Sequence, residues 1–559
     1  MQHSSVLLHL LWLIALVLPT WASSEPIDLQ RSLVELLEPM DGERPGTVVG
    51  LVRDGELVAA HAVGLADLSF GVPFAADTPT NIGSTGKQFT GYALALLQER
   101  GQLSLDDDIR DYFPELPDFG ETVTLRHLAT HTSGYREFLN TLGLAGVRIE
   151  KGDWIEPEEA IALIKRQPEL QNNPGAEWNY NNTGFVLLAK VIEEVTKTPF
   201  TEWLAQEVFQ PLNMDSTRVR PDPTFVLTSA ARGYSKDGED WREARDLGGA
   251  AGAGAVYTTL ADMARWMLEL GGFAHGGSTV GEMLTEPFEG TTYGLGLIIE
   301  DWRGQRRWQH GGGDLGHLSA FYYYPDLGAG VMVFANHHEL PPGLVTELTE
   351  LLLGDSLDPA PRRADTVPAE EDAPFEDAFF DAYAGRYELE IMPGFVLRFF
   401  RDGERYMTQA TGQPAFEIIP VDARTFRIDV VDARIVFEVD EDGQAPALTL
   451  FQNGEHRAVR LEDEDEVPRP DPTEFVGRYF SAELETFYAL SVEDDALVLR
   501  HRRFGPVTLH HKQDDAFQAA FPLATVDFMR DEDGRVTGLK AGNQRTRDVW
   551  FERLDSSPR

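Results

Sequence analysis

The sequence predicts an α+β domain built on one antiparallel sheet, followed by two all-β antiparallel barrels. Three observations lead to this prediction. Within residues 26–355, β-prone runs occur near both ends and helical periodicity fills the middle, a pattern typical of a sheet built from both ends of a domain. Two segments rich in proline and acidic residues then divide the rest of the chain. The two parts that these segments separate resemble each other in sequence.

The composition limits the possible functions. The 559 residues include 48 Lys and Arg against 92 Asp and Glu, which gives a formal net charge of −44. Because phosphate binding requires clustered Lys and Arg, this balance argues against nucleic acid or an anionic membrane as a partner. The chain has no cysteine, which excludes disulfides, thiolate catalysis and cysteine-ligated zinc.

Residues 1–22 are predicted to form a signal peptide. Residues 6–18 are apolar apart from His9, which matches a signal-peptide core and is shorter than the ~20 residues of a membrane-spanning helix. Small residues around Ala22 offer a cleavage site, whereas the lack of Lys and Arg before the apolar run leaves a buried N-terminal helix as the alternative. We therefore expect a periplasmic or secreted protein without a stable membrane span.

The first domain is predicted to span residues 26–355. Residues 48–52 and 57–63 are β-prone and are joined through Asp54-Gly55, which indicates a hairpin. Residues 88–100 have helical periodicity and are followed by Gly101, a common helix stop. Further helices are expected over 158–166, 183–196, 260–270 and 344–353, and further strands over 293–300, 306–310, 318–324 and 330–335.

Two linkers are predicted after the first domain. Residues 356–374 contain four prolines and an acidic cluster, and residues 462–472 are more acidic still. Such stretches do not easily hold a helix or a central strand, because proline lacks the amide hydrogen and fixes its own backbone angle. We interpret both as solvated spacers.

The barrels are predicted over residues 375–461 and 473–555. Gly385-Arg-Tyr returns 92 positions later as Gly477-Arg-Tyr, and Asp440-Glu-Asp-Gly returns 91 positions later. Each copy consists of short runs of Val, Phe, Leu and Ile between Asp-Gly turns. This pattern suits a small antiparallel barrel, which closes its own sheet edges.

A first candidate catalytic motif, Ser84-Thr-Gly-Lys87, opens the helix predicted over 88–100. The i, i+3 spacing places Ser84 and Lys87 on one helical face, with the hydroxyl near the positive end of the helix dipole. Serine becomes a good nucleophile when an adjacent base takes its proton, and lysine can be that base when its pKa is lowered from ~10.4. Taken alone, the motif also fits a helix N-terminus with a surface lysine.

A second motif, Tyr180-Asn-Asn182, lies at the start of another predicted helix. A tyrosine near a lysine ammonium loses its proton more easily and can serve as a base or proton shuttle. Asn182 can orient Lys87 and hydrogen-bond a substrate amide. A helix cap is the alternative interpretation.

A third motif, His310-Gly311-Gly312-Gly313, ends the strand predicted over 306–310. Glycine weakens a strand, so three in succession indicate a place where another group approaches the backbone closely. A carbonyl held there could direct its oxygen at backbone N–H groups, which would form half of an oxyanion hole. A flexible turn is the alternative.

Together, the three motifs and their order resemble the superfamily of serine β-lactamases and penicillin-binding proteins. Within it, the sequence is similar to the branch shared by cephalosporinases, D-aminopeptidases and β-lactamase-like esterases. Residues 103–107, 128–134 and 248–254 share in this resemblance. We interpret His131, within the second of these segments, as part of a structural turn.

The resemblance implies a role for each motif. The residues implied in catalysis are Ser84 as the nucleophile, Lys87 and Tyr180 as its base partners, and Asn182 and His310 in support. The N–H groups of Ser84 and Gly313 would form the oxyanion hole, and Gly311 and Gly312 would bind the substrate. Water would hydrolyse the acyl-enzyme, so no metal or cofactor is needed.

One departure from the superfamily concerns the third motif. True β-lactamases have Lys-Thr-Gly there, whereas this chain has His310-Gly-Gly. Histidine, with a reference pKa of ~6.5, is mostly neutral at neutral pH and holds a substrate carboxylate less well than lysine. We therefore expect recognition to depend less on a free carboxylate, which disfavours β-lactams and D-Ala-D-Ala termini. His-x-Gly is similar to the D-aminopeptidase-like members, which also carry two C-terminal barrels.

The predicted function is that of an exported serine hydrolase acting through an acyl-enzyme on small amide, peptide or ester substrates. A β-lactamase or D-alanyl-D-alanine carboxypeptidase is the enzymatic alternative. An alternative of another class is a sensor or scaffold that is acylated without turnover, with barrels that bind a ligand. The sequence leaves open whether the barrels cap the active site and which oligomeric state the protein adopts.

Overall fold

The computed structural model describes most of the chain. The described residues are 28–245, 250–359, 377–390, 395–403, 405–410, 415–428, 433–440, 443–452, 455–461 and 470–554. The predicted signal peptide and most of the two predicted linkers therefore lie outside the described residues. The domain boundaries given above stay predictions.

The first domain is built on a six-stranded antiparallel sheet in the order β10-β11-β12-β13-β1-β2. These strands are β1 Thr47–Arg53, β2 Glu56–Val63, β10 Ile298–Trp302, β11 Gln305–Asp314, β12 His317–Tyr324 and β13 Ala329–Ala335. The N-terminal hairpin joins the C-terminal strands where β1 pairs with β13, with Thr47 opposite Ala335. This confirms the prediction of one antiparallel sheet built from both ends of the domain. The strand predicted over 293–300 begins only at Ile298, because Gly296 has a φ of +92° that interrupts the extended chain.

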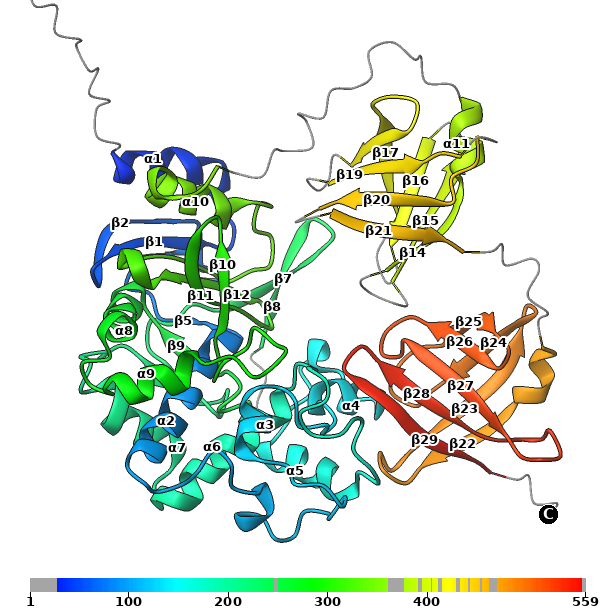
Figure 1. The fold of residues 1–559 in the computed structure, drawn as a ribbon, viewed down its shortest axis with the longest axis horizontal. Helices are drawn as coiled ribbons and strands as arrows, with labels where there is room; N and C mark the ends of the chain where they lie inside the picture. The colour runs from blue at the N-terminus through cyan, green and yellow to red at the C-terminus, as the bar shows by residue number, and fades with distance from the viewer. Residues whose placement is uncertain are drawn as a thin grey trace, which may run out of the picture.

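Helices cover both faces of this sheet (Figure 1). Side chains alternate along a strand, so Val331 and Val333 lie on one face while Met332 and Phe334 lie on the other. The first pair packs with α1 Leu29–Leu37 and α10 Leu344–Leu353. The second pair packs with α2 Lys87–Glu99 and α8 Leu260–Gly272. Every residue of β13 is therefore buried.

The other elements of the domain lie between the two ends of the sheet. The remaining helices are α3 Leu125–Ala129, α4 Phe138–Leu144, α5 Pro157–Arg166, α6 Asn182–Thr196, α7 Phe200–Leu204 and α9 Ser278–Thr285. The remaining strands are β3 Leu65–Asp67, β4 Val72–Pro73, β5 Thr80–Asn81, β6 Arg218–Val219, β7 Gly233–Asp237, β8 Asp240–Ala244 and β9 Val256–Thr258. β5 pairs with β9 directly before the turn that holds Ser84.

Two closed barrels of eight antiparallel strands follow, as predicted. The first consists of β14 Gly385–Leu389, β15 Val396–Asp402, β16 Arg405–Ala410, β17 Ala415–Pro420, β18 Thr425–Ile428, β19 Ala433–Glu438, β20 Ala447–Phe451 and β21 Glu455–Arg460, with α11 Asp377–Tyr383 before it. The second consists of β22 Gly477–Ser481, β23 Thr486–Glu493, β24 Ala496–Arg500, β25 Val507–Gln513, β26 Ala516–Ala519, β27 Thr525–Arg530, β28 Val536–Asn543 and β29 Thr546–Leu554. The two closing pairs are β14 with β21 and β22 with β29.

The sequence repeat between the barrels has a structural basis. Tyr387 and Tyr479 are fully buried in their barrels. Each hydroxyl donates a hydrogen bond to the carbonyl four residues earlier, that of Tyr383 at 2.7 Å and that of Phe475 at 2.8 Å. The Gly-Arg-Tyr repeat thus places an aromatic ring in each core and satisfies its polar end.

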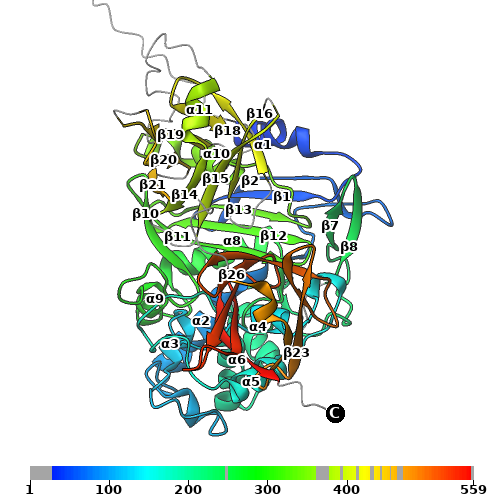
Figure 2. The same cartoon turned by 90° about the vertical axis from the view of Figure 1, so that its right-hand side faces the viewer.

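The second barrel packs against the helical part of the first domain. Figures 1 and 2 place it beside α4, and α4 contacts β28. Phe138 and Leu144 of α4 share one hydrophobic core with Tyr488 and Leu539 of the barrel. The Tyr488 hydroxyl donates to the Leu144 carbonyl at 2.8 Å. The first barrel has a core cluster of its own.

Candidate active site

Ser84 and Lys87 lie on consecutive turns where the chain enters α2. Ser84 belongs to a 3-10 turn, Gly83–Gly86, and Lys87 begins the α-helix. The Ser84 side chain is partly exposed, whereas Lys87 is completely buried. The Lys87 Nζ donates a hydrogen bond to the Ser84 Oγ at 3.1 Å. The surface-lysine alternative does not hold, because this lysine has no contact with solvent.

Lys87 is held by two further acceptors. Its Nζ donates to the Asn182 Oδ1 at 2.7 Å and to the Ala253 carbonyl at 2.6 Å. The Asn182 Nδ2 in turn donates to the Glu137 Oε1 at 2.9 Å. Burial lowers the pKa of Lys87 well below its usual value, and the Glu137 carboxylate opposes that shift. The three donated hydrogen bonds use all three N–H groups of the ammonium form. The lowered pKa favours loss of one of these protons, which would leave a lone pair able to accept a proton.

Tyr180 lies over the Lys87 amine. The Lys87 Nζ is 4.9 Å from the centre of the Tyr180 ring. The Tyr180 hydroxyl is buried and forms no hydrogen bond of normal geometry within the described residues. Burial raises the pKa of Tyr180 above its usual value, and the nearby Ser84 hydroxyl partly opposes this. The phenol is thus protonated at neutral pH, contrary to the expectation from the sequence that it loses its proton more easily, because burial dominates its pKa.

The glycines after His310 let β11 lie backbone to backbone against the turn that carries Ser84. β10 pairs only with residues 305–309 of β11, so the glycines extend past the end of β10. A Cβ on Gly312 would lie 1.9 Å from the Ile82 carbonyl oxygen, and one on Gly83 would lie 2.8 Å from the Gly313 nitrogen. Gly313 itself is exposed, and a Cβ there would meet nothing within 4 Å. The Ser84 turn and the open backbone of Gly313 therefore border one space.

His310 lies behind this strand edge, and among the described residues its hydrogen bonds do not reach the side chains of Ser84 and Lys87. Its Nδ1 donates to the Gly311 carbonyl at 2.5 Å, since a carbonyl can only accept. Its Nε2 consequently accepts from the Tyr293 hydroxyl at 2.7 Å. Burial, with a smaller contribution from the charge of Lys87, lowers the pKa of His310 to about 3. The third motif thus carries no positive charge at neutral pH.

Comparisons with known proteins agree with this geometry. The model of the beta-lactamase family matches residues 29–354. The chain belongs to the beta-lactamase family. A D-aminopeptidase from Brucella anthropi is 25% identical over 539 residues, which cover 92% of this chain and 96% of the relative. Penicillin-binding protein 4* from Bacillus subtilis is 25% identical over 445 residues, which cover 74% of this chain and 94% of the relative.

Solved structures show the same fold. The octameric penicillin-binding protein homologue from Pyrococcus abyssi has a TM-score of 0.54 at 24% identity, with 77% of this chain and 99% of that chain covered. The resemblance found in the sequence is therefore confirmed, and the protein is a serine hydrolase of the beta-lactamase family. The roles of individual residues are taken up below as proposals.

Three groups of this beta-lactamase-family site were not assigned a role from the sequence. Glu137 is completely buried behind Asn182, and Tyr293 holds His310. His131 occupies a left-handed turn (φ +61°), as expected of a structural turn, but its ring also packs 4.2 Å from the Tyr180 ring. Glu137 follows three residues after the Thr-Ser-Gly segment, and that closeness is the signal that could have found it.

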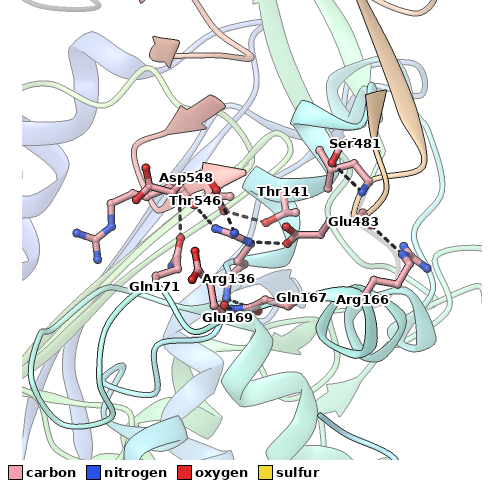
Figure 3. A network of polar contacts seen from close by, with 12 residues as sticks. Arg136, Thr141, Arg166, Gln167, Glu169, Gln171, Ser481, Glu483, Thr546 and Asp548 are labelled. Carbon is pink, nitrogen blue, oxygen red and sulfur yellow. Dashed lines mark hydrogen bonds and ion pairs between the residues drawn. The ribbon is translucent and has the colours of Figure 1, made fainter. Parts of the chain in front are cut away.

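The second barrel of the hydrolase borders the same site. The interface holds a buried ion pair between Arg136 and Glu483 at 2.5 Å, shown in Figure 3. Arg136 also donates to the carbonyl of Arg547, and the hydroxyls of Thr141 and Thr546 are 2.8 Å apart. The contacts of Thr546 and Arg547 fix the hairpin between β28 and β29 beside α4, whereas Glu483 lies in the turn between β22 and β23 (Figure 3).

One cavity of the enzyme lies apart from this site. A cavity of 450 Å³ is lined by Trp154, Arg220 and Tyr257 among others and by none of the predicted site residues. Within the described ranges, no three acidic or histidine side chains gather as a metal site would require. Among the described residues, no helix is long and apolar enough to cross a bilayer.

Proposed function

We propose that this protein is an exported hydrolase that cleaves small amide, peptide or ester substrates through an acyl-enzyme on Ser84. The observation that carries the proposal is the buried amine of Lys87, 3.1 Å from a partly exposed serine hydroxyl. Burial lowers the pKa of this amine, which meets the requirement for a base that activates serine at neutral pH. Export rests on residues 1–22, which lie outside the described residues.

The groups around Ser84 divide the proton transfers between them. Lys87 takes the hydroxyl proton while the Ser84 Oγ attacks the substrate carbonyl. The N–H groups of Ser84 and Gly313 receive the oxyanion, and Gly311 and Gly312 border the bound substrate. Tyr180, protonated because burial raises its pKa, gives its proton to the leaving group and is reprotonated through Lys87. Water then attacks the acyl-enzyme with the same base, which restores the serine.

The substrate class is narrowed by the third motif. His310 has its pKa lowered to about 3, so this position lacks the cation that true β-lactamases place there. The similarity to D-aminopeptidases extends through both barrels. Both observations support small D-amino acid amides, short peptides or esters over β-lactams and D-Ala-D-Ala termini. A β-lactamase or D-alanyl-D-alanine carboxypeptidase remains the alternative.

Covalent labelling tests the proposal. The full chain is incubated with a fluorophosphonate and, separately, with a penicillin, and the adduct is located by peptide mass spectrometry. We expect a fluorophosphonate adduct on Ser84 that is lost in Ser84→Ala, and slow or no reaction with penicillin. An adduct elsewhere, or none, contradicts the proposal. Stoichiometric acylation by an ester substrate without turnover would instead support the sensor or scaffold function.

A further inference from the structure

Arg545 lies in the hairpin between β28 and β29 of the second barrel and reaches the candidate active site. Its guanidinium carbon is 4.6 Å from the centre of the Tyr180 ring. The side-chain amides of Asn179 and Gln171 donate to the Arg545 carbonyl at 2.9 Å and 3.2 Å. Because Asn179 directly precedes Tyr180, the backbone of the arginine is fixed to the segment that carries the tyrosine.

The residues beside Arg545 make the hairpin rigid. The Thr546 hydroxyl donates to the Glu137 carbonyl at 3.1 Å, and the Asn543 amide donates to the Asn140 carbonyl at 3.0 Å. Glu137 also belongs to the chain of hydrogen bonds that ends at Lys87. Glu137 therefore belongs both to the contacts that hold the Arg545 hairpin and to those that hold the Lys87 amine.

Arg545 differs from the other arginines of this interface in its lack of an acidic partner. The paired arginines are Arg136 with Glu483, Arg547 with Glu177, and Arg503 with Asp153. For the Arg545 guanidinium, no ion pair or side-chain hydrogen bond exists with the residues that the structure describes. In a chain with 92 acidic and 48 basic residues, a cation left without a carboxylate has donors available for an anion from outside.

The other basic groups of the site are not available for an anion. The Lys87 Nζ already donates to three acceptors. His310 is neutral, since its pKa is lowered to about 3. Within the described part of the site, Arg545 is therefore the cation whose donors remain free.

We propose that Arg545 binds an anionic group of the substrate, so that among the proposed substrate classes the enzyme prefers peptides and esters with a carboxylate near the scissile bond over simple D-amino acid amides, whose α-ammonium lies close to that bond. The inference rests on the proposed function of Ser84. A guanidinium offers two parallel N–H donors to a carboxylate. The contact of the Arg545 guanidinium with the Tyr180 ring uses none of these donors in a hydrogen bond with a described residue. An ammonium group in the same place would be repelled.

Matched substrates test this preference in the full-length protein. The first series consists of D-alanine p-nitroanilides with an N-succinyl, an N-acetyl or a free amino group. In the second series of substrates, the leaving group carries either a carboxylate or its methyl ester. Both series are needed because the anionic group could lie on either side of the scissile bond. We expect kcat/KM to be highest for an anionic member. In Arg545→Gln the anionic-to-neutral ratio of kcat/KM should fall at least tenfold, and Arg545→Lys should retain part of it.

The neighbouring arginine supplies the control. Arg547 lies two positions along the same hairpin and pairs with the exposed Glu177, so Arg547→Gln should leave the ratio unchanged. The proposal is overturned if Arg545→Gln slows all matched substrates by the same factor, which would mean that the arginine only positions Tyr180. It is overturned equally if the wild type prefers the free amine.

Labelling rates separate this inference from the proposed function and need no turnover. Fluorophosphonates that carry a carboxylate or its methyl ester are compared for their rate of reaction at Ser84 in wild type and Arg545→Gln. Labelling at Ser84 with an unaltered ratio contradicts the role of Arg545 alone. Absence of labelling at Ser84 in the wild type contradicts the proposed function, and with it the substrate preference.

Discussion

Lys87 and Glu137 are both completely buried, and the side-chain amide of Asn182 bridges them with hydrogen bonds of 2.7 Å and 2.9 Å. The Glu137 carboxylate and the Lys87 amine are thus connected by the Asn182 amide in a region without solvent. Burial favours the neutral amine and the carboxylate favours the charged form, so the opposition of these effects sets the pKa of the proposed base.

Glu137→Gln is therefore expected to shift the pH dependence of the enzyme. Glu137 raises the pKa of Lys87, so its neutralisation should lower that pKa further. The base is then deprotonated down to a lower pH, and the acidic limb of the kcat/KM profile should move to lower pH. Glu177→Gln, at an exposed ion pair with Arg547, is the control. An upward or absent shift contradicts the assignment of Lys87 as the base.

Tyr180→Phe should discriminate between good and poor leaving groups. Loss of a general acid reduces the rate by about 10²–10⁴-fold where the leaving group needs a proton, so amides should suffer far more than p-nitrophenyl esters. The hydroxyl has no hydrogen-bond partner of normal geometry among the described residues, so thermal unfolding should hardly change. Equal loss on esters and amides would remove the proton-donor role.

Gly312→Ala should disturb the packing of β11 on the Ser84 turn. The new Cβ would lie 1.9 Å from the Ile82 carbonyl, and such overpacking typically costs about 1–3 kcal/mol. We expect a lower melting temperature together with slower acylation of Ser84. Gly354→Ala is the matched control, since a Cβ there meets nothing within 4 Å. A Gly312→Ala protein as stable and reactive as the wild type would contradict the close approach.

His310→Lys should alter the recognition of terminal carboxylates. The substitution restores a cation at the third motif, so activity on amides with a terminal carboxylate should rise relative to activity on matched amides without one. The ratio of kcat/KM for the two substrates measures the effect. An unchanged ratio means that this position does not contribute to carboxylate recognition.

The ion pair between Arg136 and Glu483 should hold the second barrel in place. Arg136→Met leaves the buried carboxylate without its partner, which typically costs about 3–5 kcal/mol. The double variant Arg136→Met/Glu483→Gln should be less destabilised than Arg136→Met alone, because no unpaired charge is then buried. Thermal unfolding of the wild type, Arg136→Met, Glu483→Gln and the double variant provides a double-mutant cycle. A double variant less stable than both single variants contradicts this account.

Much of the fold and part of the site could be predicted from the sequence, because they depend on short-range spacing and on repeated motifs. The i, i+3 spacing of Ser84 and Lys87 and the glycines after His310 point to short-range geometry, and the repeated Gly-Arg-Tyr marks the barrels. The position of Arg545 beside Tyr180 could not be predicted in this way, because 365 positions separate the two residues. Only the packing of the barrel on α4 brings the two together.

Glu137 was missed for a related reason. In the sequence, Glu137 is one of 92 acidic residues. Only the folded chain shows that its side chain is buried near the Lys87 amine. The pattern of a motif identifies which groups can react. Its place three residues after the Thr-Ser-Gly segment marks Glu137 as a candidate. Its hydrogen bond with Asn182, which lies in another segment, is seen only in the folded chain.

The residue proposed here to set selectivity and the residues proposed to carry out the chemistry lie in different parts of the chain. Exchange of the C-terminal 90 or so residues between related enzymes would replace the hairpin facing Tyr180 and keep the proposed nucleophile, base and oxyanion donors. Recombination at the junction between the barrels would therefore be a short evolutionary route to new substrates, and directed evolution of this enzyme would best begin with libraries at residues 543–546.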